Sequence, residues 1–419
     1  MFQKIKRILY FPFASYFRFF ASIRLKIWRP RIIVITGSSG KTTLLHLIEA
    51  QLGDVAKYTH KANSSFGIPF NILGLQRNDL TLIEWPLLFL QAPFAIFKTL
   101  PKEKIYIVEA DCDRPGEGKF LSSFIRPEIT LWLNVSRTHS GNFNSNGFKS
   151  IDEAIAYEFG YFAENTKKLV IANVSSQLLV DQLKRISCEL KEISGIKSLT
   201  KYEINLGNTC YQINNETYDF KYLLPREMAV SILMCKELLS YLNIKFDKKF
   251  LKFNLPSGRS GLFNGLKGTT LIDSTYNANL DSMKAMVDMF GRINADKKWL
   301  VLGDMIEQGE VEKEEHIKLA EIISGHNFQQ VILMGPRVTE YTYPELRRTG
   351  KNFILEHFLG PKEVLGYLNA NIKGGEVILF KGARFLEGVI ENLLEDKSDA
   401  QYLARREKIW EIRRKKWGL

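Results

Sequence analysis

The sequence predicts an α/β protein with two successive domains, each built on a parallel sheet. Short runs of β-branched and apolar residues, typical of buried parallel strands, alternate along the chain with helical apolar spacing. Polar or small residues follow most of these strand patterns, as they do at the ligand edge of doubly wound sheets. A turn-rich stretch at 256–261 (PSGRSG) separates two such series and predicts an interdomain hinge.

Composition sets the frame for this prediction. The chain has 419 residues, of which 45% are hydrophobic and 25% are charged, so it has the composition of a globular protein with room for two or three domains. Its four cysteines are scattered and form no C-x-x-C pair. They predict neither a disulfide framework nor a zinc site, and we therefore expect a reducing, cytoplasmic environment.

Residues 1–30 form a basic and aromatic N-terminal segment. Residues 1–31 hold eight Lys or Arg and no acid, and no uncharged run approaches the ~20 residues of a membrane-spanning helix. Two alternatives are left open: a helix lying peripherally at the inner face of the membrane, or a helix packed on the body of the protein or on a partner. The C-terminal tail, 398–419, is also basic, whereas the body between the two ends is nearly neutral. This distribution gives no reason to expect nucleic-acid binding.

The first strand pattern, at 32–36, runs into the sequence GSSGKTT. Gly37, Ser38, Ser39 and Gly40 form a tight loop, and helical spacing starts right after Lys41, Thr42 and Thr43. Loop amides and a helix N-terminus make an anion site, so we expect Lys41 to reach the β- and γ-phosphates of a nucleotide and a threonine hydroxyl to hold Mg²⁺. The first glycine of the general P-loop pattern is replaced by Ile35. The alternative, a glycine turn with a chance lysine, is disfavoured because the motif stands at the start of the helix.

The next elements add candidate ligands. Residues 85–100 are very apolar and contain two prolines, which predicts a buried helical hairpin, with a patch facing a membrane or lipid as the alternative. A strand at 105–109 ends in Glu109, which we expect to bind Mg²⁺ directly or through water. A third strand, 129–135, ends near Asn134 and is followed by His139, for which a structural and a functional role are both open.

The remaining patterns complete the domain division. Helix, strand and helix patterns fill 150–255, with a β-rich segment at 195–222, and four further strands follow the hinge. We expect a P-loop ATPase central domain with a parallel sheet at 31–255, a C-terminal Rossmann-like α/β domain at 256–397, and the basic tail from 398.

Eight motifs in order resemble the Mur ligase family: TGSSGKTT, NSSFGIP, VEADCDRPGE, LNVSRTH, LPSGR, LIDSTYNANLDSM, VLGDMIEQG and LFKGAR. They are most similar to the branch that adds D-alanyl-D-alanine to a UDP-N-acetylmuramoyl tripeptide. The resemblance implies an ATP- and Mg²⁺-dependent ligase that activates a carboxylate as an acyl phosphate and couples it to an amine. It also implies that domain closure excludes water.

The resemblance further implies roles for individual residues. Thr42, Glu109 and His139 match metal positions, and Arg259 matches a group that reaches the γ-phosphate. The catalytic set it implies is Lys41, His139, Arg259 and Lys381. The nucleotide-binding set comprises Gly37, Ser38, Ser39, Gly40, Lys41, Thr42, Thr43, Asn134, Asp273, Tyr276, Asn277 and Asn279.

Three departures from the family pattern leave the substrate open. About thirty residues precede the first strand, too few for the family's N-terminal UDP-sugar domain. Phe159 stands where the family has a carbamylated lysine, and Ser274 replaces the second of two aspartates. The expected partners are a small-molecule or lipid-linked peptide precursor and an amino acid or dipeptide. The alternatives are a Mur-type ligase for another acid and amine, such as a polyglutamate or a cofactor, and a nucleotide-binding protein without ligase activity.

Overall fold

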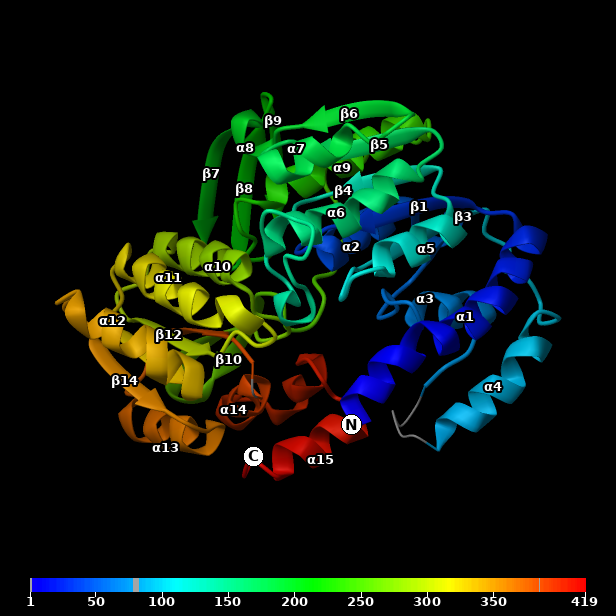
Figure 1. The fold of residues 1–419 in the computed structure, drawn as a ribbon. Coiled ribbons are helices and arrows are strands. Elements are labelled where there is room, and N and C mark those ends of the chain that lie inside the picture. Colours follow the sequence, from blue (N-terminus) through cyan, green and yellow to red (C-terminus); the bar gives the residue numbers. More distant parts are fainter. Residues whose placement is uncertain (1, 78–82, 384) are drawn as a thin grey trace. The chain divides into compact units, whose positions relative to one another are not determined.

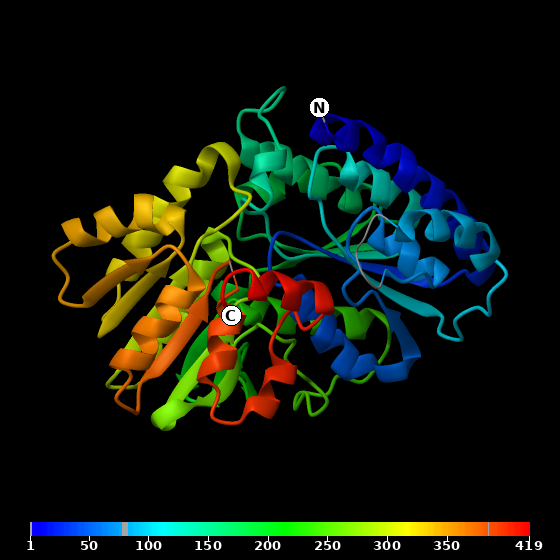
Figure 2. The same cartoon turned by 90° about the horizontal axis from the view of Figure 1, so that it is seen from below.

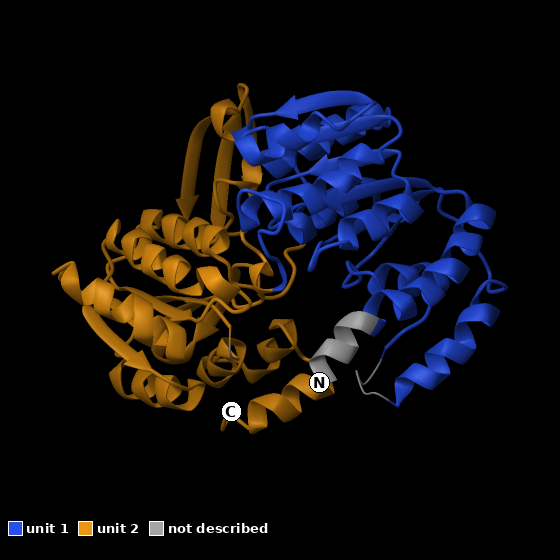
Figure 3. Ribbon diagram, in the orientation of Figure 1, with its two compact units in different colours: residues 1–136, 142–195, 230–253 blue, residues 137–141, 196–229, 254–419 orange. Residues whose placement is uncertain are grey.

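A computed structural model describes residues 2–77, 83–383 and 385–419 and divides the chain into two compact units (Figure 3). Unit 1 contains residues 1–136, 142–195 and 230–253. Unit 2 contains residues 137–141, 196–229 and 254–419. The division into domains at 30/31, 255/256 and 397/398 stays a prediction.

Unit 1 is built on a six-stranded sheet in the order β2-β3-β1-β4-β5-β6, and every strand pair in it is parallel. The strands are β1 (Arg31–Thr36), β2 (Ala56–Tyr58), β3 (Ile105–Ala110), β4 (Ile129–Trp132), β5 (Leu169–Asn173) and β6 (Glu189–Ile193). The predicted strands at 32–36 and 105–109 are confirmed, and the one at 129–135 ends at Trp132. Because β1 lies between β3 and β4, the loops after these three strands meet at one edge of the sheet.

Helices lie on both faces of this sheet (Figures 1 and 2). They are α1 (Phe2–Trp28), α2 (Lys41–Leu52), α3 (Gly67–Leu73), α4 (Glu84–Ala95), α5 (Glu117–Ile125), α6 (Ile151–Glu164), α7 (Gln177–Leu183) and α9 (Met228–Tyr241). Alternate strand residues such as Val34, Val108 and Val170 pack into one apolar core with α1, α5 and α6. The sheet is thus covered as in a doubly wound α/β domain.

Helix α1 packs on the body of unit 1. Its buried side chains, Ala14, Phe17, Ala21, Leu25 and Trp28, recur at helical spacing and belong to the core. This packing is one of the two alternatives that the sequence leaves open for residues 1–30. Among the described helices, none is both long enough and apolar enough to cross a membrane.

The helical hairpin predicted for residues 85–100 is wrong, because one continuous helix, α4, covers most of this stretch. Pro93 lies inside the helix and has no N–H to offer the carbonyl of Phe89. The hydroxyl of Tyr16 on α1 donates to that carbonyl instead, at 2.8 Å. The helix therefore continues through the proline, and only one of its faces is buried.

Unit 2 contains a second six-stranded sheet in the order β10-β11-β15-β12-β13-β14, in which only the edge pair β10-β11 is antiparallel. Its strands are β10 (Gly261–Gly265), β11 (Thr269–Ser274), β12 (Lys298–Gly303), β13 (Gln330–Met334), β14 (Ile354–Phe358) and β15 (Val377–Lys381). This sheet confirms the predicted Rossmann-like α/β part of the chain, with the antiparallel edge as an addition.

The helices of unit 2 again cover both faces of its sheet (Figure 2). They are α10 (Leu280–Arg292), α11 (Glu312–Ser324), α12 (Tyr343–Arg348), α13 (Pro361–Asn371), α14 (Leu386–Leu393) and α15 (Lys408–Lys415), whereas the short helix α8 (Gly195–Ser198) leads into the β-rich segment. The β-rich segment predicted at 195–222 is a three-stranded antiparallel sheet of β7 (Leu199–Asn205), β8 (Asn208–Ile213) and β9 (Glu216–Phe220).

Candidate functional site

The loop of residues 37–40 joins β1 to α2, and its two glycines are required by its shape. Gly37 has φ +129°, and a Cβ there would lie 2.9 Å from the carbonyl oxygen of Asn134. Gly40 has φ +84°, in the left-handed region, and directly precedes the first residue of α2. Because the loop delivers the chain straight into a helix N-terminus, its amides and the helix dipole favour an anion at this point.

A second loop, after β4, braces the first. The side-chain amide of Asn134 accepts from the N–H of Ser39 and donates to its carbonyl, both at 3.0 Å. The hydroxyl of Ser38 donates to the carbonyl of Ser136 at 2.9 Å. Asn134 therefore acts in this structure as a support for the loop, and the predicted contact between Asn134 and the nucleotide stays a prediction.

Lys41 lies buried beneath this loop. Its Nζ donates to the carbonyl of Gly37 at 2.5 Å and forms an ion pair with Asp111 at 2.7 Å. Asp111, also buried, directly follows β3 and was missed as a site residue. Its position after a buried strand, two residues beyond Glu109, is the signal in the sequence that identifies it. The pair holds the ammonium group in place at the carboxyl edge of the sheet.

Thr42 and Glu109 meet beside the lysine. Strand pairing sets Glu109 opposite Ile35, near the end of both strands. The hydroxyl of Thr42 donates to the carboxylate of Glu109 at 3.0 Å. A hydroxyl and a carboxylate that converge next to a phosphate loop are oxygen ligands of the kind that Mg²⁺ prefers, so these residues fit that ion.

Phe159 and its neighbour Glu158 have separate roles. Phe159 is fully buried in the core of unit 1, whereas the carboxylate of Glu158 accepts from the N–H groups of Gly116 (2.7 Å) and Gly118 (3.0 Å). Burial raises the pKa of Glu158. This acid, missed in the sequence, fixes the turn that follows Asp111 and thereby supports the loop after β3.

His139 belongs to unit 2. Its Nδ1 lies 2.6 Å from a carboxylate oxygen of Glu307, and this hydrogen bond lowers the pKa of Glu307. The backbone of His139 has φ +53°, which is uncommon for a residue with a Cβ and marks a constrained position. The metal role predicted for His139 stays a prediction.

The loop after β11 carries the other predicted nucleotide residues. Asp273 is fully buried, and one of its oxygens accepts from the N–H and the hydroxyl of Thr275, at 3.0 and 2.7 Å. Burial raises the pKa of Asp273. Asn279 caps the N-terminus of α10, where its side chain accepts from the N–H of Ser282. The side chain of Asn279 therefore organises the loop and the start of the helix.

Lys381 ends β15, and strand pairing brings it level with Ser274. Its Nζ donates to the carbonyl of Asn277 at 2.9 Å. Burial and the nearby charge of Arg259 lower the pKa of Lys381 to about 7. A buried lysine with a pKa close to neutrality is a candidate for contact with an anionic substrate, since a negative charge favours its protonated form.

Tyr276 lies between two arginines. The guanidinium carbon of Arg259 is 5.0 Å from the centre of its ring, and that of Arg405 is 5.8 Å from it. Arg405 also donates to the carbonyls of Thr275 (3.1 Å) and Tyr276 (2.6 Å). Arg405 belongs to the basic tail, and no motif in the sequence marks it as part of the site. The structure therefore unites Arg259, Tyr276 and a missed residue, Arg405.

Comparison with known families matches most of the chain. Residues 35–225 match the family described as the Mur ligase middle domain, and residues 258–384 match the Mur ligase, glutamate ligase domain. The first match includes the phosphate loop, and the second includes the loop after β11 and Lys381.

Individual proteins are similar over nearly the same range. The UDP-N-acetylmuramoyl-tripeptide–D-alanyl-D-alanine ligase of Bacillus subtilis is 24% identical over 381 residues, which cover 87% of this chain and 76% of that ligase. Among solved structures, MurF from Acinetobacter baumannii superposes with a TM-score of 0.73 at 17% identity, covering 91% of this chain and 80% of that one. MurF ligase from Thermotoga maritima in complex with ADP gives 0.69 at 22% identity, covering 90% and 82%.

Proposed function

This chain belongs to the Mur ligase family of ATP-dependent amide ligases, and we propose that it joins D-alanyl-D-alanine or a similar amine to a cell-wall peptide precursor. The relatives named for this reaction support the choice of amine and acceptor, and the residues of the two units support the chemistry.

One observation carries the proposal: the paired contacts at the carboxyl edge of the sheet in unit 1. Lys41 is held between Gly37 and Asp111, and Thr42 is held by Glu109. A lysine, a helix N-terminus, a hydroxyl and a carboxylate at one strand edge are the parts that a phosphoryl-transfer site needs. These parts support phosphoryl transfer from a nucleotide, and the similarity to the Mur ligases supports a carboxylate as the group that receives the phosphoryl.

In the proposed mechanism, unit 1 holds the phosphates. The amides of the loop at 37–40 and the ammonium of Lys41 bind the β- and γ-phosphates and balance the charge that develops on them. Thr42 and Glu109 hold Mg²⁺, which supplies further positive charge to the phosphates when it is bound. Asp111 keeps Lys41 oriented before the nucleotide arrives.

Unit 2 supplies the predicted nucleoside and substrate residues. We assign Asp273, Tyr276, Asn277 and Asn279 to the adenosine, with Arg259 and Lys381 as cations for phosphate or for the acidic substrate. His139 stays assigned to the metal. Lys381 hydrogen-bonds to the loop that carries Asn277, so the cation and the nucleoside loop form one local arrangement.

The reaction balances in two steps. A carboxylate oxygen of the acceptor attacks the γ-phosphorus and ADP leaves, which gives an acyl phosphate. The amine nitrogen then attacks the acyl carbon, loses a proton, and expels inorganic phosphate that carries the former carboxylate oxygen. The chain contributes position and positive charge to both steps, because phosphoryl transfer asks for little covalent chemistry from the protein.

Two further assignments accompany this function, and one point is left to experiment. We propose a domain division into 1–30, 31–255, 256–397 and 398–419. We propose a cytoplasmic protein, in line with the four free cysteines. We leave the carrier of the peptide, UDP-linked or lipid-linked, to be read out by the same experiment that tests the reaction.

The test is the mass of the product. The purified chain is incubated with ATP, Mg²⁺, D-alanyl-D-alanine and a muramoyl tripeptide that is UDP-linked in one reaction and lipid-linked in another. We expect one equivalent of ADP for each amide formed, with the product heavier than the acceptor by the dipeptide less one water.

Two variants make the result specific. Lys41→Ala is expected to abolish turnover, whereas Lys184→Ala, at an exposed lysine on the same unit, is expected to leave it unchanged. Turnover that survives Lys41→Ala contradicts the phosphate site. ATP cleavage without an amide product from either acceptor contradicts the proposed substrates.

A further inference from the structure

Helix α4 exposes a continuous apolar face. Leu87, Leu90 and Phe94 recur at intervals of three or four residues and share one side of the helix, and Ile83 directly before it and Phe97 just after it continue the same spacing. Their side chains are between 57 and 86% exposed. Five large apolar side chains lined up along a helix in this way are unusual on a surface that faces only water, and such patches mark interaction sites.

The opposite face of α4 is fixed to the protein. Leu88, Ala92 and Ala95 are buried, and Phe89 packs against Phe17 of α1 with ring centres 4.8 Å apart. The exposed face therefore belongs to a helix whose other side is firmly packed. An apolar character on all sides of a helix is typical of a helix that is covered on all sides.

Arg24 of α1 holds the C-terminal end of α4. Its guanidinium donates to the carbonyl of Ala95 (2.6 Å), the last residue of the helix, and to the carbonyls of Lys98 (2.9 Å) and Thr99 (2.8 Å) just beyond it. Arg24 is 4% exposed, and its Nε has no hydrogen-bond partner in the part of the chain that the structure describes. The end of the apolar face is thereby locked in position next to a buried positive charge.

This end of α4 opens into a basic cavity. The cavity has a volume of about 830 Å³, and its lining includes three cations, Arg24, Lys57 and Lys98, and one acid, Glu103. Burial and the charge of Arg24 lower the pKa of Lys57. Glu103 acts in the opposite direction on Lys57, but one carboxylate does not balance three cations, so the cavity keeps an excess of positive charge that an anion would offset.

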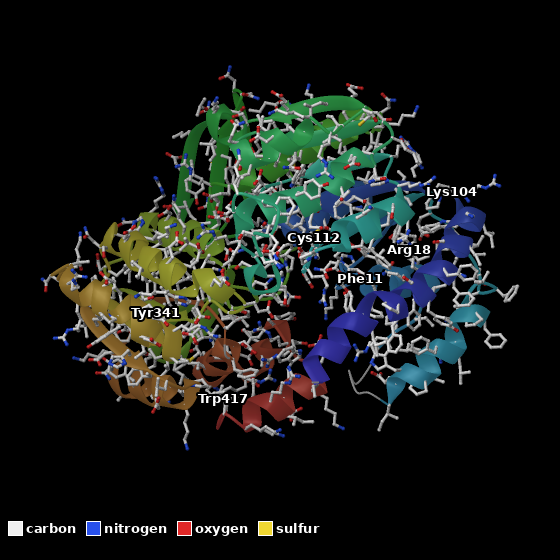
Figure 4. The ribbon with its side chains drawn as sticks, viewed as in Figure 1. Phe11, Arg18, Lys104, Cys112, Tyr341 and Trp417 are labelled. Atoms are coloured by element: carbon white, nitrogen blue, oxygen red, sulfur yellow. The ribbon has the colours of Figure 1, made fainter. Side chains whose placement is uncertain are left out.

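Further exposed cations lie within a few residues, along the chain, of those that line the cavity: Lys26, Arg29, Lys102 and Lys104. Lys104 extends outward from the edge of unit 1 (Figure 4), and α4 lies beside α1 at the periphery (Figure 1). Acids are fewer, since residues 9–31 contain none and residues 84–108 contain only Glu84, at the start of α4, and Glu103. An apolar face bordered by cations is complementary to a surface that is apolar within and negative at its boundary.

We propose that α4 docks unit 1 on an anionic lipid bilayer, with the apolar face inserted among the acyl chains and the basic cavity holding a lipid phosphate. The helix lies in the plane of the interface, as expected for a helix of about 18 Å that is too short to span a bilayer. The docking surface belongs to α4, and α1 packs against the opposite side of that helix. The docking does not depend on the ligase reaction, since the phosphate loop lies at the other edge of the same sheet.

A bilayer fits these observations better than a second copy of the chain does. A copy would present the same cations around the same apolar face, and like charges would meet at the contact. Anionic lipids instead attract each basic residue near the surface.

The test is co-flotation of the full-length chain with vesicles, either of phosphatidylcholine alone or of phosphatidylcholine with 30% phosphatidylglycerol. We expect clear binding to the anionic vesicles and weak binding to the neutral ones. The double variant Leu87→Ser/Phe94→Ser should bind at least tenfold more weakly, because it loses two apolar side chains that would insert among the acyl chains. Both side chains are exposed, so their loss leaves the core intact. Lys98→Gln/Lys102→Gln should reduce binding severalfold on anionic vesicles only.

The matched control is Leu251→Ser/Leu359→Ser, which removes two apolar side chains that are also well exposed, 79 and 59%, but do not belong to α4. This control should bind vesicles like the unchanged chain. Equal binding of the α4 variant and the control overturns the proposal. So does sedimentation that shows a dimer which only the α4 variant dissociates, with no vesicle binding, since the occupant is then a second copy. ATP cleavage without vesicles should be the same in all four proteins, which separates this result from the fate of the proposed function.

Discussion

Two buried lysines, Lys41 and Lys381, illustrate how differently the two units treat a positive charge. Both are about 95% buried, and both lie at the carboxyl edge of a parallel sheet. Lys41 forms an ion pair with Asp111 at 2.7 Å, whereas the Nζ of Lys381 donates to a backbone carbonyl and lies near Arg259. The charge of Lys41 is thus balanced by a carboxylate of its own unit, whereas the charge of Lys381 lies near a second cation.

Burial is the main cause of the lowered pKa of Lys381, and the nearby charge of Arg259 adds to it. An adjacent carboxylate favours the ammonium form, while burial next to a guanidinium disfavours it. The pKa of Lys381 accordingly falls to about 7. A lysine that is paired with a carboxylate stays charged and suits a phosphate site that is always ready. A lysine whose charge is disfavoured suits a group that becomes protonated when an anion binds next to it.

The largest effect is expected from Lys41→Met. It removes the ammonium from the phosphate loop and leaves the buried carboxylate of Asp111 without its partner. Turnover should fall by about 10²-fold or more, and the free energy of unfolding should fall by about 3–5 kcal/mol. Urea unfolding and ADP release measure the two quantities.

A second variant separates the two losses. In Lys41→Met/Asp111→Asn the unpaired charge is gone, so most of the stability should return while turnover stays lost. A single variant as stable as the unchanged chain would show that the pair is not buried as the structure has it.

Lys381→Met tests, through pH, the lysine whose charge is disfavoured. The folded chain releases this proton near pH 7, whereas the unfolded chain keeps it to about 10.5. Between these values the unfolded chain binds more protons, so the stability of the unchanged protein rises with pH. The variant does not have to bury a charged lysine, which costs the unchanged protein free energy below pH 7. Its melting temperature should therefore be higher by about 5 °C at pH 6, with the difference shrinking toward pH 10. A difference that is the same at all pH values would contradict the assigned state of Lys381.

Arg405→Ala tests the contribution of the tail to unit 2. The change removes two hydrogen bonds from the loop at 275–276 and one ion pair from the buried Glu387. We expect a loss of about 1–2 kcal/mol in the free energy of unfolding and a severalfold higher KM for ATP. Arg413→Ala, at an exposed residue of the same tail, is the control and should change neither. An unaltered KM in Arg405→Ala would remove Arg405 from the site.

The smallest effect on stability is expected from His139→Gln. The pair with Glu307 is partly exposed, and such pairs contribute about 0.2–1 kcal/mol. Because His139 lowers the pKa of Glu307, this contribution is present above the ordinary pKa of a glutamate and disappears as the pH falls through the lowered value. A loss in turnover much greater than this change in stability would support the metal role, and equal small losses would argue against it.

Much of the fold was predictable because its signals are local. The run of β-branched residues at 32–36 is β1, and GSSGKTT gives the loop and the start of α2. The two α/β units and the β-rich segment follow from the same kinds of pattern. Lys41, Thr42 and Glu109 were found because each lies next to the end of a predicted strand, and β1 and β3 are neighbours in the sheet.

Other features depend on contacts between distant residues and leave little trace in the sequence. Arg405 reaches the loop at 275–276 from a tail that shows only basic charge. The prediction for residues 85–100 failed because Tyr16, far away in sequence, satisfies the carbonyl that Pro93 leaves open. Asp111 and Glu158 were missed because their partners, Lys41 and the turn after β3, are brought to them by the fold.

The most direct test of the central claim, an ATP-dependent ligase that works through an acyl phosphate, follows a single oxygen atom. The muramoyl tripeptide is labelled with ¹⁸O in its terminal carboxylate and incubated with the chain, ATP, Mg²⁺ and D-alanyl-D-alanine, and the inorganic phosphate is analysed by mass spectrometry. The account predicts one ¹⁸O in each phosphate released, with none released by Lys41→Ala. Unlabelled phosphate accompanying amide formation would contradict it.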